Sequence, residues 1–161
     1  MAMHELPKPW FDIDGYKRTR LLEARYEVEL AKRFLDEGLT RNAAGKAFQA
    51  VRALLAALAV DNKDRLIAKY PGKVRIKGGK TVDRVYWVIA VMPTNYMLGL
   101  SALIGEDIHY LTSIALHLHQ YQYNGPDREG VLSQYRTDDE AREDVLLVIN
   151  NVNKILSKLG I

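Results

Sequence analysis

Cysteine is absent from this 161-residue chain, and histidine occurs only four times. Without thiols the chain forms no disulfides, holds no thiolate zinc site and has no cysteine nucleophile. A chain without cysteine also suits a reducing compartment, so we expect a cytoplasmic protein. The first 20 residues carry charges and two prolines where a secretion signal has an apolar core, and we therefore do not expect export.

Long uncharged stretches are also scarce, with one exception at residues 85–104, where twenty consecutive residues lack a charge. A stretch of that length is long enough to cross a membrane. The tripeptide Pro-Thr-Asn at residues 93–95 divides it into apolar pieces of eight and nine residues, which suit buried helices. We expect a central apolar helix that is kinked or interrupted at Pro93 and has no contact with a membrane. A membrane-associated role is the reserve hypothesis.

Apolar periodicity typical of helices dominates the rest of the chain. Apolar residues recur at three- and four-residue spacing over four segments, residues 16–37, 40–60, 106–124 and 137–160. A glycine closes three of these segments, as is common at helix C-termini. The sequence therefore predicts an all-α fold, an antiparallel, up-and-down bundle of four to six helices.

We expect one domain over residues 1–161, because a chain of this length buries roughly two-thirds of its unfolded surface around a single core. Residues 1–15 are predicted to form an irregular arm whose Trp10 and Phe11 dock onto the helices. Residues 73–80 are the one segment where a short strand or hairpin is possible, because Gly78 and Gly79 suit a turn. We nevertheless interpret this segment as a basic loop, and no part of the chain as a sheet.

The net charge of +3 is too small to mark the whole chain as a nucleic-acid-binding protein. The positive charge is concentrated between residues 63 and 84, where eight Lys and Arg face two Asp. The candidates in this segment for binding phosphate or nucleic acid are Lys73, Arg75, Lys77, Lys80 and Arg84. The competing interpretation is a solvated, mobile surface loop.

The motif Gly-Gly-Lys-Thr at residues 78–81 is similar to the end of a nucleotide-binding phosphate loop. Such a loop needs another glycine five positions before the second one, so that backbone N–H groups can surround the phosphates. Val74 occupies that position, and no buried strand precedes it. We therefore do not interpret the motif as the site of a nucleotide hydrolase.

Two histidines lie two residues apart in the segment LTSIALHLHQYQYNG, residues 111–125. On a continuous helix, His117 and His119 point roughly 200° away from each other, so they cannot hold one metal ion. A helical pair of metal ligands needs a spacing of three or four residues. We expect neither a metal nor a cofactor.

The same segment has a clear apolar stripe. Its members on a helical wheel are Ile108, Leu111, Ala115 and Leu118, and His119 lies at the edge of the stripe. A histidine in that position is usually a hydrogen-bonded structural residue, but a packed helix can also hold a functional one. The sequence leaves both interpretations open.

The segments AGKAFQAVRALLAAL (residues 44–58) and LHLHQYQYNG (residues 116–125) resemble the HEPN superfamily and, within it, the archaeal PaREP-type proteins. In the latter, a leucine-histidine step is followed by an aromatic residue and a glycine. The matching residues here are Leu118, His119, Tyr123 and Gly125. The resemblance extends over roughly residues 17–160.

The resemblance implies an up-and-down helical bundle that pairs into homodimers. In active members of the superfamily, an arginine four to six residues before a histidine contributes to a metal-independent ribonuclease site across the dimer. No arginine occupies that position before His109, His117 or His119. Because RNA cleavage needs a base and also a cation to stabilise charge on the phosphate, we interpret the chain as a non-catalytic member.

Two hypotheses about function follow. The leading one is a homodimeric binding module for a nucleic acid, a nucleotide or an unidentified protein partner, with the basic loop as its contact surface. The alternative is a metal-independent ribonuclease with a rearranged site. In that site His117 or His119 is the base and Tyr123 is an auxiliary proton donor.

Overall fold

The computed structural model describes residues 5–161. Its elements in chain order are α1 (Ile13–Asp36), α2 (Thr40–Asp61), α3 (Lys63–Lys69), β1 (Lys73–Arg75), β2 (Thr81–Asp83), α4 (Arg84–Val91), the 3₁₀ helix η1 (Thr94–Tyr96), α5 (Met97–Ile104), α6 (Glu106–Asn124) and α7 (Asp138–Lys158). The predicted helical class is confirmed. The described residues form seven α-helices, more than the expected four to six, because the central apolar segment and the segment after α2 form separate short helices.

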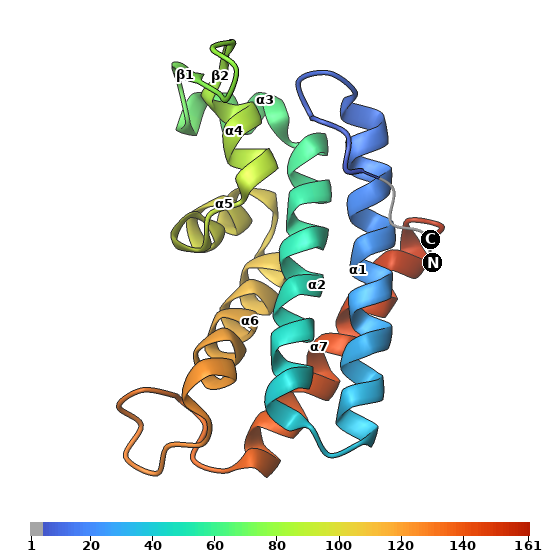
Figure 1. Cartoon of the computed structure of the whole chain (residues 1–161), viewed down its shortest axis with the longest axis vertical. Coiled ribbons are helices and arrows are strands. Elements are labelled where there is room, and N and C mark those ends of the chain that lie inside the picture. Colours follow the sequence, from blue (N-terminus) through green and yellow to red (C-terminus); the bar gives the residue numbers. More distant parts are fainter. Residues whose placement is uncertain (1–4) are drawn as a thin grey trace.

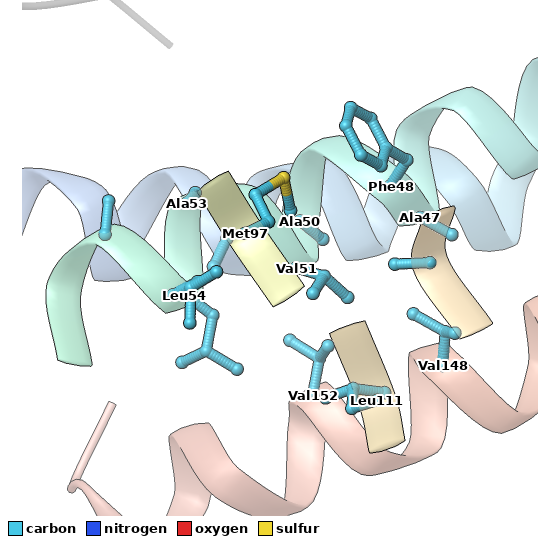
Figure 2. Packing of buried hydrophobic residues seen from close by; sticks show 14 of the residues in the cluster. Ala47, Phe48, Ala50, Val51, Ala53, Leu54, Met97, Leu111, Val148 and Val152 are labelled. Carbon is cyan, nitrogen blue, oxygen red and sulfur yellow. The ribbon is translucent and has the colours of Figure 1, made fainter. Parts of the chain in front are cut away.

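Helix α2 lies at the centre of the molecule, with α1, α6 and α7 packed along it (Figure 1). Eight alanines of α2 are buried, and these small side chains let neighbouring helices approach closely. Figure 2 shows Ala47, Val51 and Leu54 of this helix in the apolar core. Residues from three other helices pack in the same region, namely Met97 of α5, Leu111 of α6, and Val148 and Val152 of α7.

Helix α2 is also long and apolar enough to cross a membrane, but 72% of its apolar stretch is buried inside the molecule. Core helices have the same composition, because a helix covered on all sides is hydrophobic all round. Helices α4 and α5, with η1 before α5, pass the same test only as a pair, across a bend of 113°. The uncharged run at residues 85–104 is therefore not one straight helix.

The expected interruption at Pro93 is confirmed. Helix α4 ends at Val91, and Met92 has a φ of +43°, in the left-handed region that non-glycine residues rarely adopt. Proline has no N–H group to continue the helix, and its ring disfavours a helical conformation in the preceding residue. The chain therefore turns sharply between α4 and η1. We call residues 91–93 the elbow.

Three side chains from α1 and α2 donate hydrogen bonds to four carbonyl groups, three in the last turn of α4 and one of Met92, the residue that follows it. Tyr16 Oη donates to Ile89 O at 2.6 Å, Arg20 Nη2 to Ala90 O at 3.0 Å, Arg52 Nη2 to Val91 O at 2.7 Å, and Arg52 Nε to Met92 O at 3.2 Å. Unpaired carbonyl groups at a buried helix end cost free energy. The elbow is therefore stabilised by donors that lie some 40 to 70 residues away in the sequence.

The interpretation of residues 73–80 as a loop outside any sheet is wrong. Strands β1 and β2 pair antiparallel, with Lys73 opposite Asp83 and Arg75 opposite Thr81. Gly78 and Gly79 have φ angles of +91° and +85°, which glycine adopts without strain, and they form the turn. Strands of three residues are too short to show an alternating pattern, so only the glycine pair, and no periodicity, pointed to this hairpin.

Helices α1 and α7 have well-defined N-terminal ends. Helix α1 begins at Ile13, so the irregular arm is shorter than expected. Trp10 is partly buried, but Phe11 is 86% exposed, and the expectation that both aromatic residues dock is wrong for Phe11. At α7, Thr137 accepts a hydrogen bond from the backbone N–H of Glu140 and caps the helix.

Candidate functional site

The β1–β2 hairpin carries cations that have no partner in the described part of the chain. The side chains of Arg75, Lys77 and Lys80 are exposed and form neither an ion pair nor a hydrogen bond with residues 5–161. The other two predicted residues are engaged: Lys73 Nζ lies 2.9 Å from Asp83 Oδ1, and Arg84 Nε donates to Pro71 O at 3.3 Å. The structure therefore places four of the five predicted residues on one hairpin and Arg84 directly after it, at the start of α4. Three of the five are left available for a ligand.

Helix α3, which leads into the hairpin, adds three more cations. Lys63 Nζ donates to Tyr86 Oη at 2.8 Å, and Lys69 Nζ donates to Gly99 O at 3.0 Å. Arg65 is exposed, with no side-chain partner among residues 5–161. These cations adjoin the hairpin because α3 ends at Lys69, shortly before β1 begins at Lys73. The backbone N–H of Arg84 donates to Gly72 O and closes the base of the hairpin.

The charge of this end of the molecule differs from that of the rest. Residues 63–84 hold eight of the 23 basic and two of the 20 acidic residues, so the remaining chain is net negative. The hairpin lies at the end of α2 opposite the α6–α7 connection (Figure 1). The net charge of +3 is therefore the sum of one strongly basic segment and a net negative remainder. We call residues 63–84 the basic end; they comprise α3, the β1–β2 hairpin and Arg84.

The second candidate site centres on His119 of α6. Its ring stacks on Phe48 of α2 with centroids 4.0 Å apart, and Tyr123 meets it edge-on at 5.3 Å. Its Nδ1 atom is buried and has no hydrogen-bond partner within residues 5–161. Burial lowers the pKa of His119, the charge of Arg52 acts in the same direction, and Gln122 opposes them. The imidazole is therefore neutral near pH 7 and able to accept a proton.

The three residues of the predicted ribonuclease site are only partly brought together. His117 is exposed, and it lines a hollow of about 430 Å³ with His119, Ser113 and Asn95. Tyr123 lines a separate hollow of about 580 Å³ between α1, α2 and α6, together with Arg41, Lys46 and Gln122 among others. His119 and Tyr123 are in contact, but Tyr123 does not face the hollow that the two histidines share.

Arg52 is a residue that sequence reasoning missed. It comes from α2, and its charge acts on His119 of α6, although 67 positions separate them. A search of the sequence for an arginine shortly before a histidine cannot find a cation on another helix whose charge lowers the pKa of that histidine. Its place in the segment that carries the HEPN resemblance was the one available signal.

Metal binding finds no support in the described residues. Among residues 5–161, no three His, Cys, Asp or Glu side chains come close enough together to hold an ion. His117 and His119 have no carboxylate beside them that would complete a set of ligands.

The fold and these sites define a small helical protein with a central alanine-rich helix, a basic hairpin at one end and a histidine held between α2 and α6. The chain belongs to the archaeal PaREP1/PaREP8 family, whose model matches residues 19–146. The resemblance to PaREP-type proteins is thereby confirmed. No curated protein and no solved structure matches the chain.

Proposed function

We propose that this protein is a nucleic-acid-binding module whose contact surface is the basic end. The observation that carries the proposal is the set of three exposed cations on the hairpin, Arg75, Lys77 and Lys80, none of which has a partner in residues 5–161. A cation already paired within its own protein gains little from a phosphate, whereas a free one releases condensed counterions when it binds. Arg75 lies in the paired strand β1, and Lys77 and Lys80 lie in the turn that joins β1 to β2.

We further propose that this protein is HEPN-like, forms homodimers and is cytoplasmic. The helical fold, the segment at residues 44–58 and the histidine segment support the HEPN-like assignment. An unidentified protein partner is the competing ligand for the basic end. Sedimentation analysis of the purified protein tests the dimer, and a monomer at micromolar concentration would contradict it.

The test of nucleic-acid binding uses a triple variant, Arg75→Ala, Lys77→Ala and Lys80→Ala. Fluorescence anisotropy with a labelled RNA oligonucleotide at several salt concentrations measures the dissociation constant and its dependence on salt. We expect affinity at low salt to fall roughly 10- to 100-fold and the slope of log K against log salt to shrink by about 2.

A matched control removes the same charge elsewhere. Arg18, Lys154 and Lys158 are exposed and form no ion pair with the described residues, and they lie on α1 and α7. Their triple alanine variant has the same net charge as the hairpin variant, and we expect nearly unchanged affinity. Equal losses in the two variants would mean that net charge, and not the basic end, drives binding.

A ribonuclease is the second candidate function, and the neutral imidazole of His119, which lines a hollow with His117, favours it. A neutral imidazole can take the proton of a ribose hydroxyl, and the cation that stabilises charge on the phosphate would come from the basic end or a partner subunit, since Arg52 is bound to Val91 O and Met92 O. The candidate predicts chelator-resistant cleavage of RNA that His119→Gln abolishes while the helical circular dichroism is unchanged. RNA left intact by the folded wild-type protein would contradict it.

A further inference from the structure

An aromatic cluster lies at the base of the hairpin. Tyr70, which ends α3, and Tyr96 of η1 have parallel rings with centroids 5.5 Å apart and an interplanar angle of 6°. Trp87 of α4 meets Tyr96 edge-on at 6.2 Å. All three rings are partly buried, so each keeps a part of its surface exposed. The end of α3, η1 and α4 thus contribute three rings that contact one another in series, with Tyr96 in the middle.

Two lysines lie over tyrosine rings in the same region. Lys69 Nζ is 5.9 Å from the ring centroid of Tyr70, and Lys63 Nζ is 4.7 Å from that of Tyr86. Gly99 makes room for the first pair, since a Cβ atom there would lie 3.0 Å from Lys69 Nζ. Cations and aromatic faces are therefore interleaved at this end of the molecule.

The aromatic cluster adjoins the base of the hairpin because the chain joins them directly. Tyr70 stands two residues before Gly72 and Tyr86 two residues after Arg84, and the hydrogen bond from Arg84 N to Gly72 O at 2.9 Å closes the base between them. On their inner side the rings pack against the apolar core, which includes Leu66 and Val88, and their remaining surface is exposed. The Tyr70 and Tyr96 hydroxyl groups form no hydrogen bond within residues 5–161, so no such bond accounts for tyrosine at either position.

We propose that the basic end and the adjoining aromatic cluster recognise single-stranded nucleic acid, with phosphates on the hairpin cations and unpaired bases stacked on Tyr70, Trp87 and Tyr96. This inference rests on the proposed function and narrows its ligand. A positive groove with aromatic side chains is how proteins bind unpaired strands of any sequence, because every base has a flat face that can stack. In a duplex those faces are already covered by neighbouring bases, so only the phosphates remain for contact.

The experiment compares four probes by anisotropy and competition: a 15-nucleotide single strand as RNA and as DNA, its duplex, and inorganic polyphosphate. We expect either single strand to bind more tightly than its duplex at equal phosphate concentration. The double variant Tyr70→Leu, Tyr96→Leu should weaken single-strand binding roughly 5- to 100-fold, leave duplex and polyphosphate binding unchanged, and keep the salt slope.

Two further variants separate stacking from folding. Tyr70→Phe with Tyr96→Phe keeps both rings and should bind single strands as the wild type does. Tyr26→Leu with Tyr110→Leu removes two exposed rings from α1 and α6, and should also have no effect. Loss of binding in the phenylalanine variant would overturn the stacking proposal, since its rings are intact.

The remaining outcomes distinguish this inference from the proposed function. Hairpin-dependent, salt-sensitive binding that is equal for single strand, duplex and polyphosphate would overturn stacking and leave the proposed function standing. Absence of salt-sensitive binding to every probe would overturn both proposals. Tighter single-strand binding that the leucine variant weakens and the phenylalanine variant restores supports both.

Discussion

The arginines of the helical body and the cations of the hairpin make opposite kinds of contact. In the body, Arg20 and Arg52 donate to carbonyls at the end of α4, and Arg41 donates to Gln122 O and Tyr123 O at the end of α6. Arg142 likewise donates to Leu35 O at the end of α1. On the hairpin, Arg75, Lys77 and Lys80 donate to nothing within residues 5–161.

This difference shows why a count of charges says little about function. A guanidinium bound to the unpaired carbonyls at a helix C-terminus satisfies those groups and complements the negative end of the helix dipole. Such an arginine is part of the fold, and its exposure to a ligand is secondary. Partners, and not composition, therefore separate structural cations from candidate binding cations in this molecule.

The largest effect on stability is expected for Arg52→Ala. The change removes both donors at the elbow, in the partly buried bond to Met92 O and the exposed bond to Val91 O, and Met92 itself has a positive φ. We expect the free energy of unfolding to fall by about 2–3 kcal/mol, mostly through the partly buried bond, because its donor is charged and water does not readily replace it. Urea denaturation followed by circular dichroism measures the loss, with Arg18→Ala of the exposed α1 surface as the control. A loss below about 0.5 kcal/mol would mean that the elbow does not need its donors.

A smaller loss is expected for Arg41→Ala. Arg41 donates through Nε and Nη2 to two carbonyls of the last turn of α6, at 3.1 and 2.6 Å, but it is exposed to solvent. Water can replace a donor at an exposed helix end, so we expect a loss of about 1 kcal/mol. The same denaturation series ranks it against Arg52→Ala. A loss as large as that of Arg52→Ala would contradict the role assigned to burial.

Almost no effect on stability is expected for the hairpin triple variant, Arg75→Ala, Lys77→Ala and Lys80→Ala. These side chains have no partner in the described residues, and exposed substitutions of this kind change stability by about 0.5 kcal/mol or less. Relief of repulsion among neighbouring cations should make the change slightly stabilising at low salt. A clear destabilisation would show that the hairpin cations are structural, and the comparison with the body arginines would fail.

The same comparison explains what the sequence could predict. The long helices α1, α2, α6 and α7 follow from apolar periodicity, and the break at Pro93 follows from the chemistry of proline. The basic end was visible as a charge cluster. Contacts between arginines and backbone carbonyls produce no periodic pattern, however, so the capping of α4 by Arg20 and Arg52 could not be foreseen. The effect of the Arg52 charge on the pKa of His119 could not be foreseen either.

The site was predictable in the same uneven way. Four of the five predicted phosphate-binding residues lie on one hairpin and Arg84 follows it, but their pairing depends on geometry: Lys73 is engaged by Asp83, and the side chain of Arg75 is not engaged. The aromatic cluster escaped notice because Tyr70, Trp87 and Tyr96 come from separate elements and meet only in the folded chain. Long-range contacts of this kind are what a one-dimensional pattern cannot encode.

The smallest predicted effect concerns the pH dependence that His119 contributes. Burial lowers its pKa in the folded protein, so the unfolded chain binds more protons than the folded chain between the two pKa values. His119 therefore destabilises the fold as the pH falls below about 6.5, its ordinary value, and the penalty stops growing below the folded pKa. The loss of stability between pH 7.5 and pH 5.5 should be smaller in His119→Gln than in the wild type.

His117→Gln is the matched control, because His117 is exposed on the same helix. A pH dependence that is identical in wild type and His119→Gln would mean that the ring titrates as freely as it does in water, and that its stacking on Phe48 does not keep it neutral.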